Sequence, residues 1–206
     1  MALADDLAAI LQERFLDLLR NEELELTDGQ SGMRVHVVEV SAAVAAVRLE
    51  RVGHLPGLKE RVPARRICDY ALLAESDDTI HAVLVELKAT YTQEEGPMEQ
   101  LRRSLPVLEC IRSACDVERG TGVSRAVSVG YVLVFEKEAA RALDKRTLKP
   151  VRPAARSYKD ITVNTFVGTA IPFPSLMATL PPRPPRDTRP QAPAPAPRPP
   201  TAPTAR

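Results

Sequence analysis

The sequence lacks tryptophan, and its aromatic residues are only four Phe and four Tyr. A folded core must therefore come from Leu, Val, Ile and Ala. Cysteine is also scarce, with three residues (Cys68, Cys110 and Cys115), too few and too scattered for a disulfide framework. None of the three belongs to a Cys-x-x-Cys pair, which argues against a zinc site.

Long apolar runs are missing as well, since no stretch reaches the roughly 18 apolar residues of a membrane span. The first residues, MALADDLAAILQERF, carry aspartates where a secretory leader needs basic residues. Together with the few cysteines, these absences predict a soluble protein of the reducing cytoplasm, with no membrane partner.

An excess of charge of one sign is also absent, because 28 basic residues nearly balance 27 acidic ones. This overall balance of charge is the sum of two segments with opposite net charge. Residues 181–206 hold eleven of the 19 prolines, five Arg and one Asp, so their local charge is +4 and residues 1–180 carry −3. We expect one folded domain over 1–180 and a disordered Pro/Ala/Arg-rich tail over 181–206. A body of −3 excludes nucleic-acid binding driven by overall charge alone.

Apolar periodicity predicts the elements of the domain. Residues 66–74 (RICDYALLA) and 80–88 (IHAVLVELK) are two strands around a polar turn, which indicates a hairpin. Pro106 should kink or split the helix that follows. The order indicates an α/β fold around a mixed sheet. The other expected elements are a helix from Leu3 to near Asn21, strands at 35–40, 126–135 and 161–167, helices at 97–116 and 136–146, a loop at 53–63, and a segment at 41–52 that fits either helix or strand.

Charged residues within the two hairpin strands are the unusual feature of the sequence. Burial of an unpaired carboxylate is costly unless the group is paired or binds a metal. A turn centred between Asp77 and Asp78 pairs residues whose numbers add to 155, as those of Asp69 and Glu86 do. The two carboxylates should therefore face each other, with Lys88 on the same face. A divalent cation with a preference for oxygen, Mg²⁺ or Mn²⁺, would remove their repulsion.

The stretch CDYALLAESDDTIHAVLVELKATYTQEEGPMEQL resembles the PD-(D/E)XK nuclease superfamily, in particular bacterial proteins with a CDY…VELK core and a Gln-Leu on the next helix. The resemblance implies a restriction-endonuclease-like three-layer α/β/α core. It implies metal ligands at Asp69, Glu86 and the Leu87 carbonyl, and catalytic roles for Asp69, Glu86, Lys88 and Gln100. Cys68 stands where the name-giving proline would be. A further glutamate on the first helix of many members has Glu13, Glu22 and Glu23 as candidates here.

The function implied is Mg²⁺- or Mn²⁺-dependent hydrolysis of phosphodiesters, in DNA rather than RNA. Arg66, Arg102 and Arg103 are the predicted contacts to the nucleic acid, and residues 141–159 add seven bases against one acid. One alternative is the same fold as a catalytically silent module that binds nucleic acid or protein. Another is an interaction protein that acts through its tail. A homodimer and a partner for the tail both stay open.

Overall fold

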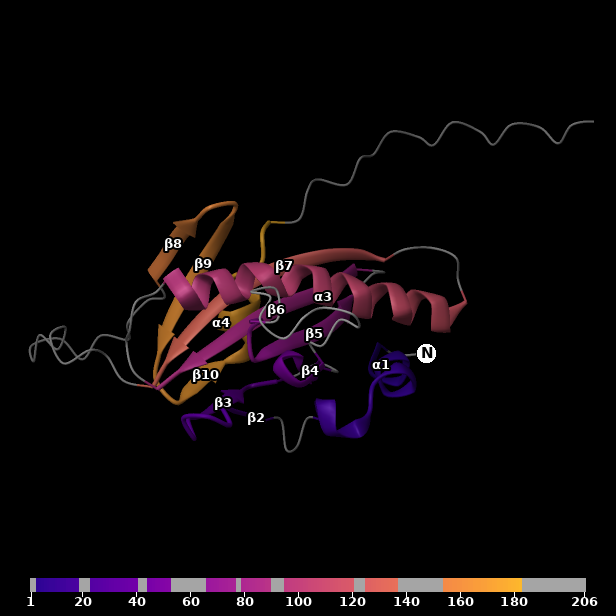
Figure 1. Cartoon of the computed structure of the whole chain (residues 1–206), viewed down its shortest axis with the longest axis horizontal. Helices are drawn as coiled ribbons and strands as arrows, with labels where there is room; N and C mark the ends of the chain where they lie inside the picture. The colour runs from indigo at the N-terminus through magenta and orange to yellow at the C-terminus, as the bar shows by residue number, and fades with distance from the viewer. Residues whose placement is uncertain are drawn as a thin grey trace, which may run out of the picture.

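The structure, a computed structural model, describes residues 3–18, 23–40, 44–52, 66–76, 79–89, 95–120, 125–136 and 154–182. The chain forms a mixed α/β fold with two sheets (Figure 1). None of the helices in these ranges is long and apolar enough to cross a membrane. In chain order the elements are α1 (Leu3–Ile10), the 3₁₀ helix η1 (Glu13–Phe15), β1 (Leu16–Leu18), β2 (Leu24–Thr27), β3 (Arg34–Val38), β4 (Val44–Arg48), α2 (Leu49–Val52), β5 (Tyr70–Ser76), β6 (Thr79–Lys88), α3 (Glu95–Arg119), β7 (Ala126–Phe135), β8 (Ala154–Tyr158), β9 (Ile161–Val167), β10 (Ala170–Pro172) and α4 (Phe173–Met177).

The large sheet has the strand order β1-β4-β5-β6-β7-β9-β8. Strands β4, β5 and β6 are antiparallel neighbours, whereas β6, β7 and β9 run parallel. Helix α3 makes the crossover between the parallel strands β6 and β7, which a direct turn cannot connect. The sheet is therefore mixed, as expected, and its centre is almost wholly apolar.

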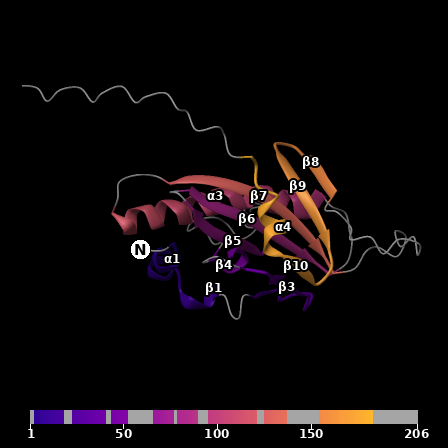
Figure 2. The same cartoon turned by 180° about the vertical axis from the view of Figure 1, so that it is seen from behind.

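The two faces of the large sheet are covered differently. Helices α1 and α3 pack on one face, where α3 crosses in front of the central strands in Figure 1. The other face carries α4 and a small mixed sheet of order β10-β3-β2 (Figure 2). Among the described residues, the second outer layer is thus largely a sheet, which differs from the helical layer implied by a three-layer α/β/α core.

The β5–β6 hairpin has the predicted register. Tyr70 pairs with Val85 and Ser76 with Thr79, so the paired residue numbers add to 155 along the whole ladder. Side chains alternate between the faces as period two requires, with Leu84 in the core under α1 and α3, and Val85 and Leu87 in the core under the small sheet. The predicted register is confirmed, but the first strand begins at Tyr70 rather than at residue 66.

Two predictions about helices are wrong. The first helix ends at Ile10, not near Asn21, because Leu16–Leu18 leaves the helix and pairs with β4 as an edge strand. Pro106 does not split the second long helix, since α3 runs unbroken over Glu95–Arg119. The early Pro97 suits the first turn, where no backbone donor is needed.

The remaining elements agree with the sequence-based predictions only in part. Strands β2, β8 and β10 and helix α4 were not expected, and the ambiguous segment 41–52 contains both β4 and α2. Strands β7 and β9 coincide with the predicted ranges 126–135 and 161–167. The predicted loop at 53–63, most of the helix at 136–146 and nearly all of the tail at 181–206 lie outside the described residues.

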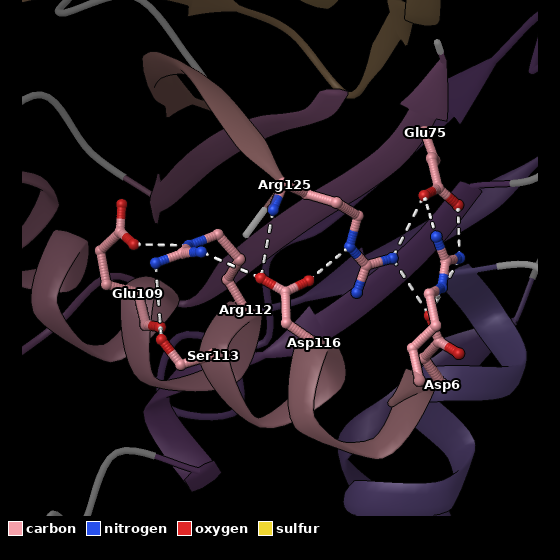
Figure 3. A network of polar contacts seen from close by, with 8 residues as sticks. Asp6, Glu75, Glu109, Arg112, Ser113, Asp116 and Arg125 are labelled. Atoms are coloured by element: carbon pink, nitrogen blue, oxygen red, sulfur yellow. Dashed lines mark hydrogen bonds and ion pairs between the residues drawn. The ribbon is translucent and has the colours of Figure 1, made fainter. Parts of the chain in front are cut away.

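A network of ion pairs ties α1, β5, α3 and β7 together at the turn end of the hairpin (Figure 3). Arg125, buried at the start of β7, contacts Asp6 of α1 at 3.1 Å, Glu75 of β5 at 3.1 Å and Asp116 of α3 at 2.7 Å. Arg119 adds contacts to the same Asp6 and Glu75. The network fixes α1 and α3 against the sheet and so holds the layer over the opposite end of the hairpin.

Candidate active site

Two acidic side chains are buried where β5 begins and β6 ends. Asp69 directly precedes β5 and is 7% exposed, and Glu86 on β6 is fully buried. Continued by one residue, the register of the hairpin sets them opposite each other. Both lie on the face covered by α1 and α3, since period two groups Asp69 with Ala71 and Glu86 with Leu84. The structure thus brings together the two acids predicted to hold a metal.

The environment of this pair opposes its ionisation. Burial raises the pKa of Glu86 to about 8, and the negative charge of Asp69 adds to the rise. Burial likewise raises the pKa of Asp69 to about 7, although the hydrogen bond from the Leu87 amide acts in the opposite direction. Burial and mutual repulsion disfavour the charged forms of both carboxyl groups. A cation bound between them would offset this cost by stabilising the two carboxylates.

Lys88 is the nearest positive charge. It lies two residues beyond Glu86 on the same face, and its ammonium forms an ion pair with Oε1 of Glu86. Burial alone would lower the pKa of Lys88, but the carboxylates around it outweigh burial and raise this pKa. The Lys88 side chain is 29% exposed, so it reaches from the buried acids toward solvent. It is therefore held charged at the mouth of the site.

The backbone at Leu87 is also part of the site. Its N–H donates to Oδ2 of Asp69 at 2.7 Å, although the Leu87 side chain points into the opposite core. In a strand, the N–H and C=O of one residue point to the same edge. The Lys88 carbonyl accepts from Glu136 beside β7, as expected if the neighbouring Leu87 groups point the other way. The Leu87 carbonyl therefore faces the side on which Asp69 lies.

Gln100 is close to the same strand end, on the second turn of α3. Its Nε2 donates to the carbonyl of Ile67 at 3.3 Å. Four residues later, Ser104 accepts from the backbone N–H of Cys68 at 2.8 Å. These two contacts fasten α3 to the segment that precedes Asp69. The buried Cys68 thiol, whose pKa is raised by burial, donates to the Tyr70 carbonyl and belongs to the core.

Sequence analysis missed two acids whose charges act on this site. Asp28, in the turn between β2 and β3, interacts with both Asp69 and Lys88, and Glu50 on α2 raises the pKa of Asp69. Burial acts to raise the pKa of Asp28, but the Ser31 hydroxyl and other partners hold it below its usual value. The local sequence marked Asp28 only as a turn residue, and no nearby signal could show that this turn reaches the end of β6.

The glutamates proposed for the first helix are placed differently. Glu13 is exposed on η1 and Glu23 pairs with His36 of the small sheet, while Glu22 lies outside the described residues. Besides Glu86, the described acids that interact with Asp69 are Asp28 and Glu50, and neither comes from the first helix.

The predicted nucleic-acid contacts flank the site. Arg66 is exposed three residues before Asp69. Arg102 and Arg103 follow Gln100 on α3, and both form ion pairs with Glu99, at 3.0 and 3.1 Å. Of the basic segment at 141–159, only Arg156 and Lys159 are among the bases that the structure describes.

The donor atoms suit a hard divalent cation. Apart from the ion pair with Lys88, the two buried oxygens of Glu86 have no hydrogen-bond partner among the described residues. Carboxylate oxygens with so few partners have lone pairs to offer a hard divalent cation. In the same ranges, no group of three or more His, Cys, Asp or Glu side chains is arranged to hold a metal ion. Two carboxylates would then depend on the Leu87 carbonyl and on water to complete the coordination.

No protein-family model, curated protein or solved structure matches the chain.

Proposed function

We propose that the protein is a metal-dependent phosphodiester hydrolase of the PD-(D/E)XK type, a nuclease that acts on DNA. The observation that carries the proposal is the buried Asp69–Glu86 pair, with Lys88 on the same face as the only cation that the described residues pair with Glu86. A protein that used these acids only for stability would pair them with arginine or replace them with apolar residues.

The arrangement of the elements supports the same proposal. The resemblance implies a core of one helix, three strands, a second helix and a further strand. The described structure contains this order in α1, the antiparallel strands β4 to β6, the crossover helix α3 and the parallel strand β7. The acids lie at the end of β6 and the start of β5, where α3 begins above the sheet (Figure 1).

In this mechanism, Asp69, Glu86 and the Leu87 carbonyl would hold Mg²⁺ or Mn²⁺. When bound, the metal would lower the pKa of a coordinated water and offset negative charge on the phosphate. Lys88 remains protonated beside Glu86, so it orients the attacking water and stabilises charge on the phosphate oxygens. Gln100 donates to the carbonyl of Ile67 and so would fix the segment that carries Asp69.

Arg66, Arg102 and Arg103 would bind the nucleic acid beside the site. Their guanidinium groups suit phosphate oxygens, which accept two parallel hydrogen bonds from one arginine. Arg102 and Arg103 follow Gln100 directly on α3, so they would be the first cations on this helix for a bound phosphate chain to meet.

A plasmid-nicking assay tests the proposed function directly. The wild-type protein should convert supercoiled plasmid to nicked or linear DNA in Mg²⁺ or Mn²⁺ and lose this activity in EDTA. Lys88→Met keeps the length of the side chain but removes the charge, and should lower the rate by at least about a hundredfold. Arg34→Gln, in an exposed pair with Glu25, is the matched control and should cleave at the wild-type rate. Equal activity in Lys88→Met and wild type would refute the assignment of the active site.

The second candidate is a silent module with the same fold, and the lack of a third side-chain ligand in the described ranges favours it. Calorimetry separates the two functions. The nuclease requires that Mn²⁺ binds to the wild type and that Asp69→Asn abolishes this binding, whereas a silent module shows no Mn²⁺ binding in either protein.

A further inference from the structure

A cluster of basic side chains surrounds Glu99 on the first turns of α3. Arg102 contacts Glu99 at 3.0 Å, Arg103 at 3.1 Å, and Lys159 from the turn between β8 and β9 at 2.7 Å. The hydroxyl of Tyr158 also donates to Glu99, at 3.3 Å. Three cations from two distant parts of the chain thus share one carboxylate, which leaves a local excess of positive charge. We call Glu99, Arg102, Arg103 and Lys159 the Glu99 cluster.

The backbone at Lys159 is unusual for a lysine. Its φ of 51° lies in the left-handed region, where hairpin turns generally place Gly, Asn or Asp. A long side chain in this conformation costs about 1 kcal/mol relative to its usual state. No requirement of the turn selects lysine here. The side chain, which is 52% exposed, stands over the Tyr158 ring at 5.2 Å and extends to α3. We therefore attribute the lysine at this position to the contact that its ammonium makes with α3.

The Glu99 cluster adjoins the proposed active site. Glu99 directly precedes Gln100, which is bound to Ile67 two residues before Asp69. The hairpin of β8 and β9 lies beside the start of α3 (Figure 1), and Asp160 of its turn interacts with both Arg102 and Tyr131. The Glu99 cluster thus joins the beginning of α3 to the tip of this hairpin.

We infer that the turn between β8 and β9 is part of the DNA-binding surface, with Lys159 joining Arg102 and Arg103 as a contact to the phosphate backbone. This inference rests on the proposed nuclease function, for which it names a docking element outside the motif. Glu99 holds the three cations together in the free protein and competes with phosphate for them. DNA binding therefore releases fewer counterions than three unpaired cations would release.

The variant Lys159→Gly tests the inference without loss of fold. Glycine adopts the left-handed conformation readily, so the melting temperature should stay equal or rise even though an exposed ion pair is lost. Affinity for a short fluorescein-labelled DNA duplex is measured by anisotropy in EDTA, at salt concentrations from about 50 to 200 mM. We expect roughly fivefold weaker binding and a salt slope lower by about 1. The control Arg34→Gln, on the small sheet, should bind like wild type.

Glu99→Gln makes the opposite prediction, since it removes the competing carboxylate and keeps the side-chain shape. Its affinity for the duplex should rise at least about twofold, with a steeper salt slope. An unlabelled RNA duplex serves as competitor in the same assay. RNA that displaces the probe better than the same DNA would overturn the assignment to DNA.

The outcomes separate this inference from the proposed function. If Lys159→Gly binds DNA with wild-type affinity and slope, the inference is overturned, and metal-dependent cleavage that requires Lys88 still supports the nuclease. If the Lys159 and Glu99 variants change DNA affinity as described but no cleavage occurs in Mg²⁺ or Mn²⁺, the surface is supported and the nuclease function fails.

Discussion

Replacement of Glu86 by glutamine should stabilise the metal-free protein at alkaline pH, although it removes a proposed metal ligand. Glutamine has nearly the same shape, so the buried site keeps its packing, but it carries no charge. In the wild type, burial and Asp69 raise the pKa of Glu86 from 4.5 to about 8. Between these two values the unfolded chain has released its proton and the folded protein has not, so wild-type stability falls as pH rises through this window.

The size of the effect follows from the two pKa values. Linkage between the folded and unfolded states gives a loss of about 4 kcal/mol from about pH 5 to about pH 9, at 1.36 kcal/mol for each pKa unit. Glu86→Gln does not titrate and should escape this loss. The difference in unfolding free energy between the variant and the wild type should therefore grow with pH, toward a gain for the variant. The ion pair with Lys88 is lost at every pH and so offsets part of this gain.

Urea unfolding followed by far-ultraviolet circular dichroism measures the effect, because the chain has no tryptophan to report by fluorescence. Glu109→Gln is the matched control, since Glu109 is an exposed acid paired with Arg112, and its stability should change by less than about 0.5 kcal/mol. At one hundred times its dissociation constant, Mn²⁺ should add about 2.7 kcal/mol to the wild type and nothing to Glu86→Gln. A difference between variant and wild type that does not vary with pH would refute the reasoning about burial.

Three further predictions concern the stability of the scaffold. Gly130→Ala on β7 would place a Cβ 2.4 Å from Oγ1 of Thr179 and should cost about 1–3 kcal/mol in urea unfolding, whereas Gly29→Ala, with open space around it, should not show such a clash. Arg125→Met leaves Arg119 as the one remaining described cation for Asp6 and Glu75 and should lower stability by about 1–3 kcal/mol in thermal unfolding. An unchanged stability would show that the network is dispensable. The arginines lower the pKa of Glu75, so stability should fall as pH drops below about 4, and less steeply in Glu75→Gln; equal acid profiles would contradict this.

The candidate site could be predicted because its signals are local. Glu86 belongs to β6 and Asp69 directly precedes β5, and one short turn joins the two strands, so the residue numbers fix the register and the alternation of side chains fixes the face. The charge of each residue inside an apolar strand marked it as exceptional. The crossover helix and strand β7 were predictable for a similar reason, because a long amphipathic pattern and an apolar run each identify one element.

The parts that could not be predicted depend on contacts between distant segments. Strand β10 pairs with β3 in parallel although more than a hundred residues separate them, and neither segment carries a signal for the other. The leucines of 16–18 continue a helical spacing, but pairing with β4 overrides it. Asp28 reaches the site only because the small sheet packs across the large one, which no local pattern encodes.

The buried acids at the two ends of the β5–β6 hairpin are paired with different cations. At the turn end, Asp6 is fully buried and its Oδ2 contacts both Arg119 and Arg125, two cations with fixed, always charged guanidinium groups. At the other end, Glu86 is equally buried but faces a second acid and a single, partly exposed lysine. If stability alone had shaped the hairpin, arginine pairs of the first kind would serve at both ends. The poorly compensated end also lies beside the segment that Gln100 of α3 contacts. The buried Glu86 is therefore compensated less fully than the buried Asp6, and the proposed metal site would account for this difference.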